Sequence, residues 1–315
     1  MAGIIEIAKK AGVSTSTVSN VLNNRKNVGA DTREKVLKVA KELGYVHKQS
    51  QGETRRKTII VNFSDYDTLF YLDILHGISD YLQKKEYRIL VCTGMDLTHY
   101  ADPDEVGGVI IIDSHTDDKD IIAVADKGVP VVTLDRKLEH GLIKSMLVSN
   151  YEGEKQLIEK LVERGYDSFA FLKGPETEDC TERYRAFRDV LKENKIPFNR
   201  NDLYEGDWRE KSGAQAARLI MLQQSMPKVL VCANDMMAIG AIRKFQENGI
   251  KVPEDIAVCG FDDIIIARYL GLTTVSVPDY ERGFLASQML IDIINGNGDF
   301  ETFNIGARVK WRKTT

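Results

Sequence analysis

The sequence predicts an α/β protein with a three-helix N-terminal head and a larger body of two parallel-sheet α/β subdomains. Residues 1–46 show helical apolar spacing with almost no strand pattern. From Thr58 onward, short apolar runs alternate with amphipathic segments, which is typical of parallel strands joined by crossover helices. Because the alternation lasts for roughly 220 residues and restarts near Tyr166, we expect two subdomains rather than one very large sheet.

Three helices are predicted in the head. Gly12 ends the first, Ser14 caps the second, Asp31 caps the third and Gly44 ends it. The apolar residues that we expect to face the head's core recur at helical spacing. They are Ile4, Ile5, Ile7, Ala8, Ala11, Val18, Val21, Leu22, Val36, Leu37, Val39, Ala40 and Leu43.

The body follows as alternating strands and helices. The predicted strands are 58–63, 87–92, 107–113, 130–135, 145–150, 168–174, 228–234 and 256–262. The predicted helices are 71–84, 119–127, 152–164, 181–193, 212–223 and 236–248. Strands that are apolar on both faces imply sheets covered by helices on both sides.

Charge divides the chain in the same way. Residues 1–57 contain 12 lysines and arginines against 5 acidic residues, whereas the rest of the chain contains 31 against 42. The head is therefore basic in a chain whose net charge is −4. This asymmetry is expected when only the head contacts a polyanion.

Composition predicts a protein that acts in the cytoplasm. The N-terminal segment has no signal-peptide core, and no apolar run approaches the roughly 18 residues that a membrane span needs. The cysteines lack the spacing of a CxxC motif or a metal finger. We expect no metal, no cofactor, and buried free thiols at Cys92, Cys180, Cys232 and Cys259.

The first two helices of the head form a helix-turn-helix pattern, although a generic helical hairpin would look similar. The second helix lies in AGVSTSTVSNVLNN, residues 11–24, which is rich in serine, threonine and asparagine. These are mediocre helix formers, but their short hydroxyls and amides suit contacts with phosphates and base edges. No acidic residue occurs from Lys9 to Ala30. The composition therefore favours a second helix that contacts DNA.

Several motifs spread over nearly the whole chain resemble the LacI/GalR (lactose/galactose-repressor) family of bacterial transcription factors. They occur in the family's order and are IIEIAKKAGVSTSTVSNVLNN, TREKVLKVAKELGY, ANDMMAIGAI, VPEDIAVCGFDD and LTTVSVPDYERG. The resemblance implies a homodimeric regulator of sugar genes, in which each head reads one half of a near-palindromic operator in double-stranded DNA. It also implies a periplasmic-binding-protein-like body, residues 58–315, that mediates dimerisation and binds a sugar or sugar derivative.

The resemblance implies positions for the DNA contacts as well. Thr15, Ser16 and Asn20 fall where the family's recognition helix reads bases. An Asn amide can pair bidentately with adenine, and many family members carry Arg at the position of Asn20, so a different operator preference is expected. The positions at which the family contacts the DNA backbone are Ser14, Thr17, Ser19, Asn23, Thr32 and Tyr45.

Residues 47–57, HKQSQGETRRK, contain no residue able to fill a core and are predicted to be a linker. In the family this segment forms a hinge helix that begins with Pro-Asn and inserts a Leu into the minor groove. Here His47 and Lys48 replace the Pro-Asn pair, the segment has no Leu, and Gly52 weakens any helix. An ordered hinge and a flexible basic tether are both open alternatives.

The family binds its ligand between the two subdomains, at the carboxyl ends of the strands. The positions that match its effector contacts are Phe70, Asp135, Arg183, Trp208, Asn234 and Asp262. The alternatives are a hydrophobic anchor for Trp208, surface salt bridges for Arg183 and Asp262, and core or structural roles for Phe70 and Asp135.

Two features depart from the family pattern. Val277 stands where the family often has a ligand-facing Gln. Residues 93–106 are too few for the usual second helix of the first subdomain and leave room for little more than a loop. We expect one wall of the cleft, or part of the dimer contact, to differ accordingly.

Other functions have less support. No GxSxG, P-loop, GxGxxG or HExxH motif occurs and the five histidines show no ligand spacing, so we expect no enzyme and no catalytic residue. The second alternative is a constitutive DNA binder, or one controlled by a phosphocarrier protein. The expected mechanism is linkage, in which the effector favours one closure state and the dimer interface transmits it to the heads. Induction and co-repression are both open.

Overall fold

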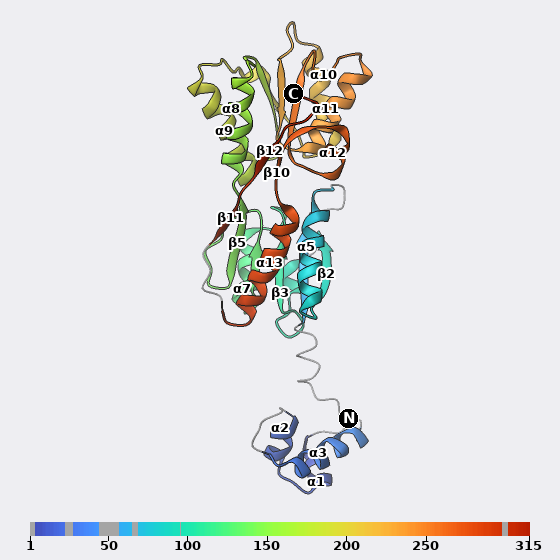
Figure 1. The fold of residues 1–315 in the computed structure, drawn as a ribbon. Coiled ribbons are helices and arrows are strands. Elements are labelled where there is room, and N and C mark those ends of the chain that lie inside the picture. The colour runs from blue at the N-terminus through green and yellow to red at the C-terminus, as the bar shows by residue number, and fades with distance from the viewer. Residues whose placement is uncertain (1–3, 23–27, 44–56, 65–68, 95, 298–301) are drawn as a thin grey trace.

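The computed structural model describes residues 4–22, 28–43, 57–64, 69–94, 96–297 and 302–315 of the chain. These residues form a helical head and a body of two stacked α/β subdomains (Figure 1). Each subdomain contains one six-stranded sheet. Within the described ranges, no helix combines the length and the apolar character that a bilayer span requires.

The head consists of α1 (Ile4–Ala11), α2 (Thr15–Leu22) and α3 (Ala30–Glu42), each of which packs against the other two. As predicted, Ser14 caps α2, because its Oγ accepts a hydrogen bond from the amide of Thr17 at 3.0 Å. The predicted cap at Asp31 is wrong. The Gly29 carbonyl accepts the first helical hydrogen bond, from Arg33, so Asp31 lies inside the first turn. A carboxylate there still interacts favourably with the helix dipole.

Two residues predicted for the head's core are exposed: Ile5 by 77% and Leu37 by 47%. In both helices the buried residues follow the i, i+3, i+4 pattern, as Val36, Val39 and Ala40 do. Ile5 and Leu37 each lie one residue past the start of such a series, which rotates them about 100° away from the core.

The first subdomain is an all-parallel sheet with the strand order β11-β5-β4-β3-β1-β2. Its strands are β1 (Thr58–Phe63), β2 (Arg88–Thr93), β3 (Gly108–Ile111), β4 (Val131–Thr133), β5 (Ile143–Val148) and β11 (Phe303–Ile305). Its helices are α5 (Tyr71–Lys84), α6 (Leu97–Tyr100), α7 (Asp118–Asp126) and α13 (Asp279–Ile294). Ile59 and Val61 pack into the core beneath α5 and α13, whereas Ile60 packs into the core beneath α6 and α7.

The second subdomain has the strand order β12-β10-β9-β8-β6-β7 and is parallel except for β12, which pairs antiparallel with β10. Its strands are β6 (Phe169–Lys173), β7 (Leu203–Glu205), β8 (Val229–Cys232), β9 (Ala257–Asp262), β10 (Thr273–Ser276) and β12 (Arg308–Lys310). Its helices are α8 (Asn150–Glu163), α9 (Glu178–Glu193), the 3-10 turn η1 (Arg200–Asp202), α10 (Glu210–Met221), α11 (Asp235–Glu247) and α12 (Ile265–Leu270).

The chain crosses between the subdomains three times, which corrects the predicted restart near Tyr166. Helix α8 precedes Tyr166 but already packs against α9, β10 and β12 of the second subdomain. After β10 the chain returns to the first subdomain as α13 and β11, and then crosses again to β12. Hydrophobic periodicity reveals each element but not the sheet that it joins, because that choice depends on contacts far apart in sequence.

Two smaller predictions agree with the structure. All four cysteines are buried free thiols. In the short segment between β2 and β3, the only helix among the described residues is the one-turn α6. Strand β2 is an edge strand, and its Leu90 and Val91 side chains are exposed.

Candidate functional sites

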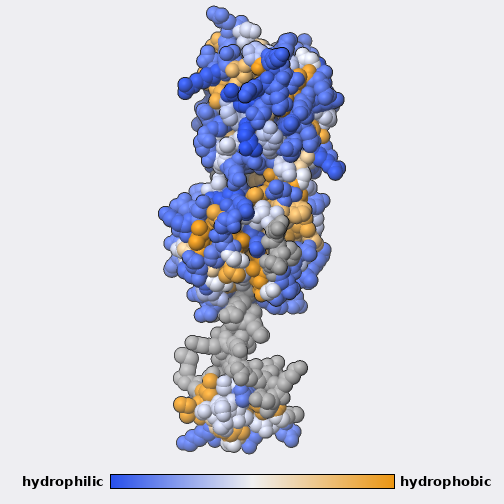
Figure 2. Space-filling model, turned by 90° about the vertical axis from the view of Figure 1, so that its left-hand side faces the viewer, coloured by the Kyte–Doolittle hydropathy of each residue, from blue (hydrophilic) through white to orange (hydrophobic). Residues whose placement is uncertain are grey.

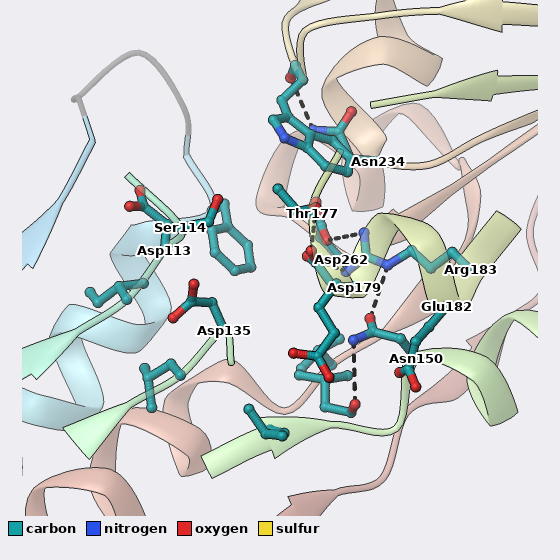
Figure 3. Close-up of a pocket in the computed structure, with 18 of the residues that line it drawn as sticks. Asp113, Ser114, Asp135, Asn150, Thr177, Asp179, Glu182, Arg183, Asn234 and Asp262 are labelled. Carbon is teal, nitrogen blue, oxygen red and sulfur yellow. Dashed lines mark hydrogen bonds and ion pairs between the residues drawn. The ribbon is translucent and has the colours of Figure 1, made fainter. Parts of the chain in front are cut away.

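A cleft of about 960 Å³ lies between the two subdomains, where the parallel strands of both sheets end (Figure 3). Asp135 follows β4, Asn150 follows β5, Asn234 follows β8, and Asp262 ends β9. This edge of an open α/β sheet is where ligands bind in such folds. All six predicted effector positions line the cleft: Phe70, Asp135, Arg183, Trp208, Asn234 and Asp262.

Arg183 of α9 is the central cation of the cleft. Its Nε donates to Oδ1 of Asn150 at 2.9 Å, its Nη1 donates to the carbonyl of Ala233 at 2.6 Å, and its guanidinium lies 3.6 Å from the ring centroid of Phe261. The carboxylates of Asp179 and Asp262 lie 3.5 and 3.8 Å from its Nη atoms. Arg183 and Asp262 are both buried, so this pair is not a surface salt bridge.

The Trp208 ring forms a wall of the cleft. It packs over Gly174, where a Cβ would come within 2.5 Å of the ring, and its centroid lies 6.0 Å from the Arg183 guanidinium carbon. The backbone carbonyl of Trp208 accepts a hydrogen bond from Nδ2 of Asn234 at 2.9 Å. The Oδ1 of Asn234 accepts from the amide of Met237 at 3.0 Å, which caps α11. Asn234 therefore ties the Trp208 loop to this helix, a structural role that its motif does not reveal.

The carboxylates of the cleft are strongly affected by burial. Burial raises the pKa of Asp135 to about 6, although Arg136, which donates from Nε at 2.7 Å, opposes the shift. The Oδ1 of Asp135 has no hydrogen-bond partner within the described part of the chain. Burial also raises the pKa of Asp262 well above its ordinary value, opposed by Arg183. A ligand that donates hydrogen bonds would satisfy these acceptors.

Residues missed from the sequence complete the site. Asn150 and Asp179 hold Arg183, and Asp113 accepts hydrogen bonds from the Tyr71 hydroxyl at 2.6 Å and the Ser64 amide at 2.7 Å. Asp113 and Asn150 both stand at the ends of predicted strands, which is a usable signal. Val277 also lines the cleft and adds apolar surface where the family often has Gln.

The charged side chains of the cleft are mostly acidic. Its carboxylates belong to Asp113, Asp135, Glu152, Glu178, Asp179, Glu182, Asp207 and Asp262. Its arginines are Arg183, Arg185, Arg209 and Arg282. Arg183 is held by Asp179 and Asp262, Arg185 lies 3.7 Å from Glu182, and Arg282 lies 3.4 Å from Asp279. Even without the buried Asp262, seven carboxyls face four arginines, and this balance disfavours an anionic ligand and suits a neutral one.

The head presents the predicted DNA-contacting residues around α2. Ser14, Thr15 and Ser16 are exposed. The Oγ atom of Ser14 lies 2.7 Å from Oγ of Ser16 and 2.7 Å from Oγ1 of Thr17. The remaining described positions, Thr17, Ser19, Asn20 and Thr32, are half-buried. Asn23, Tyr45 and most of the predicted linker 47–57 lie outside the described residues.

The sequence also matches known protein families. Residues 3–47 match "Bacterial regulatory proteins, lacI family", and residues 158–315 match "Periplasmic binding protein-like domain". The chain is 31% identical to the HTH-type transcriptional regulator RegA of Clostridium saccharobutylicum, covering 93% of this chain and 92% of RegA. It is 30% identical to the HTH-type transcriptional repressor PurR of Vibrio parahaemolyticus serotype O3:K6, with the same coverage.

Solved structures show the same architecture. A complex of the transcriptional regulator CelR with cellobiose has a TM-score of 0.75 at 27% identity, covering all of both chains. A lac repressor dimer bound to operator and the anti-inducer ONPF has a TM-score of 0.72 at 28% identity, covering 100% of this chain and 99% of that one. Both similarities extend over the head and the body.

Proposed function

The chain belongs to the LacI family of bacterial regulatory proteins, and we propose that it is a homodimeric repressor of carbohydrate genes controlled by a neutral sugar-like effector. It is a DNA-binding transcriptional regulator and not an enzyme. As a repressor it would act in the cytoplasm, on a near-palindromic operator with one head on each half-site.

The observation that carries the effector proposal is the convergence of distant residues on one cleft. Phe70 and Asp135 belong to the first subdomain, and Arg183, Trp208 and Asp262 belong to the second, yet all five line the same cleft. An aromatic wall beside paired polar groups suits the C–H face and the hydroxyls of a sugar. The acidic balance of the cleft favours a neutral sugar over a phosphorylated or carboxylated one.

The homodimer proposal draws on one exposed apolar surface. Helix α12 exposes Ile265, Ile266, Tyr269 and Leu270, whereas Figure 2 shows the opposite side of the second subdomain, which is mostly hydrophilic. Arg268 of α12 lies 3.8 Å from Asp73 of α5, beside the exposed Leu72. This surface therefore extends from one subdomain to the other, and a second copy bound to it would contact both.

The proposed mechanism follows from that placement. The effector contacts both walls of the cleft, so it binds one closure state more tightly than the other. A partner held on α12 and α5 experiences the relative movement of the subdomains and transmits it to the spacing of the two heads. DNA affinity and effector affinity are then reciprocally coupled.

Calorimetry of the full chain tests the effector proposal. The ligands are glucose, cellobiose, glucose 6-phosphate and glucuronate, which separate ring number from charge. We expect a neutral sugar to bind, and to change affinity for an operator selected from random-sequence duplexes. Tighter binding of the charged sugars would contradict the neutral assignment. Failure of every sugar, with DNA affinity unchanged, would instead favour a protein co-effector or a constitutive repressor.

A further inference from the structure

Glu154 is a fully buried carboxyl group in the core of the second subdomain. It lies on α8, and both of its carboxylate oxygens lack a hydrogen-bond partner among the residues that the structure describes. The preceding residue, Gly153, packs closely on the sheet. A Cβ added to it would lie 2.9 Å from Cγ1 of Val275 and 3.0 Å from Cβ of Ala307. Helix α8 is thus pressed onto the sheet, and the carboxyl cannot reach water.

The same face of α8 contacts the effector site. Asn150 lies one turn before Glu154, at i−4, and its Oδ1 accepts the hydrogen bond from Nε of Arg183. Asn150 and Glu154 therefore both face the side on which Arg183 lies. Burial raises the pKa of Glu154 to about 8, and the positive charge of Arg183 opposes this shift.

The other titratable groups around Glu154 come from the sheet and from α9. Cys232 of β8 and Cys259 of β9 both interact with its charge, and burial raises the pKa of each thiol well above the ordinary value, so both stay neutral. The buried carboxyl of Asp235 also interacts with both thiols and is held by Thr274 and Ile264, and Asp262 lies 3.8 Å from Nη1 of Arg183. Asp179 of α9 lines the cleft and lies 3.5 Å from Nη2 of Arg183.

We infer that Glu154 is a positioning residue of the effector site, whose protonation state sets the position of the Arg183 guanidinium. When Glu154 is protonated, it is a neutral group in an apolar core, and Arg183 keeps its contacts with Asn150 and Ala233. When Glu154 ionises, the positive charge of Arg183 opposes its negative charge, and the guanidinium is drawn from the cleft toward the core. Effector affinity then falls as the pH rises, which makes Glu154 a proton-linked control on the proposed effector site.

The fluorescence of Trp208 reports this movement without any effector, because its ring lies 6.0 Å from the guanidinium carbon of Arg183. The chain has two tryptophans, so a Trp311→Phe background leaves Trp208 as the sole emitter. Its emission is recorded in the full chain from about pH 6 to about pH 10. We expect a transition centred near pH 8, where Glu154 titrates.

Two substitutions isolate the residue. Glu154→Gln mimics the protonated state and should abolish the transition, whereas Glu163→Gln, at an exposed position on the same helix, should leave it unchanged. If Glu154→Gln does not fold, Glu154→Leu supplies a second uncharged side chain with the same expected flat profile. A transition that persists in the folded variant, or a flat profile in the parent, would overturn the inference.

The inference rests on the proposed function, but the two can fail separately. The titration uses no sugar, so a failed sugar panel does not alter its outcome. Once a sugar that binds is found, its affinity should fall between pH 7 and pH 9 in the parent and stay constant in Glu154→Gln. An equal fall in both proteins would also contradict the role of Glu154.

Discussion

At the scale of single residues, the body is distinguished by buried carboxyls whose charge is incompletely compensated. Burial raises the pKa of Asp279 to about 7 although Arg282 pairs with it, and raises that of Asp235 to about 7 although Thr274 donates to it at 2.6 Å. Glu154 has no hydrogen-bond partner among the described residues, although the charge of Arg183 lowers its pKa. Each of these groups is protonated more readily in the folded chain than in the unfolded chain, so their contributions to stability fall as the pH rises.

Glu154 allows this dependence to be tested. Its pKa is about 8 in the folded chain against an ordinary value of 4.5, so its contribution is fully present below pH 4.5 and is lost as the pH rises through 8. The difference corresponds to at most about 5 kcal/mol. Glu154→Gln should therefore gain stability relative to the wild type between pH 6 and pH 9, measured as the urea midpoint. A pH-independent difference, like that expected for Glu163→Gln, would contradict the burial argument.

Gly174 shows how a residue without a side chain shapes the cleft. A Cβ there would lie 2.5 Å from the Trp208 ring, so Gly174→Ala must displace this wall. We expect at least a tenfold loss of sugar affinity by calorimetry, about 1.4 kcal/mol, with the fold retained. Gly141→Ala is the matched control, because no heavy atom lies within 4 Å of its added Cβ. Unchanged affinity in Gly174→Ala would mean that the ring is not part of the site.

At the scale of elements, the two subdomains use the same close helix contact. Gly77 of α5 and Gly283 of α13 face each other, with added Cβ atoms only 2.0 and 2.1 Å from the carbonyl oxygens of Tyr280 and Ile74. In the second subdomain, Cβ atoms added to Gly213 of α10 and Gly240 of α11 would likewise lie only 1.9 Å from the carbonyl oxygens of Met237 and Glu210. Glycine is required in both pairs because the opposing atoms belong to the backbone and cannot move independently.

Gly77→Ala should therefore force α5 and α13 apart. Overpacking of this kind costs about 1–3 kcal/mol or more, which should lower the thermal midpoint of the body. Differential scanning calorimetry would measure it, again with Gly141→Ala as the reference. Equal midpoints for the two variants would show that the helices adjust without strain.

The α2 helix is the element on which sequence recognition should depend. Val18 and Val21 are buried and pack the helix onto the head's core, whereas the Asn20 side chain is half-buried. Asn20→Ala should relax the base preference at one operator position, because a bidentate amide contact discriminates between bases by about 1–3 kcal/mol. Binding to a panel of single-base operator variants would measure this. Uniform weakening across the panel would indicate a backbone contact instead.

At the scale of the whole molecule, the subdomains are joined by three chain crossings and by the cleft that they share. The exposed side of α12 continues onto α5 through Arg268 and Asp73. A partner bound there would therefore contact both subdomains. This arrangement places the cleft and the proposed dimer surface on the same two subdomains. Coupling between them then requires no additional element.

Tyr269→Asp tests the proposed dimer. Tyr269 is 85% exposed on α12, and a charge there should disrupt an apolar interface and yield monomers with weakened operator binding. Phe303→Asp is the control, since Phe303 is 50% exposed and its strand β11 lies on the opposite side of the body from α12 (Figure 1). Light scattering after gel filtration distinguishes the two states. A dimeric Tyr269→Asp variant, or a monomeric control, would place the interface elsewhere.

The sequence by itself determined most of the elements up to β9 and six of the residues that line the cleft. Local periodicity predicted α1, α2, α5 and most body strands, because one apolar face recurs at the period of the element. Family motifs marked Arg183, Trp208 and Asp262, whose types suit the chemistry of the site. The head's base contacts at Thr15, Ser16 and Asn20 stay predictions that the operator panel can test.

Only the tertiary structure decided which elements meet. It assigned α8 to the second subdomain and returned α13 and β11 to the first, and it turned Ile5 and Leu37 outward. It also placed Glu154, an ordinary charged residue of an amphipathic helix, in a dry core one turn from the residue that holds Arg183. The physical reason is that periodicity records a residue's own helix or strand, whereas burial and pairing depend on the partner packed against it.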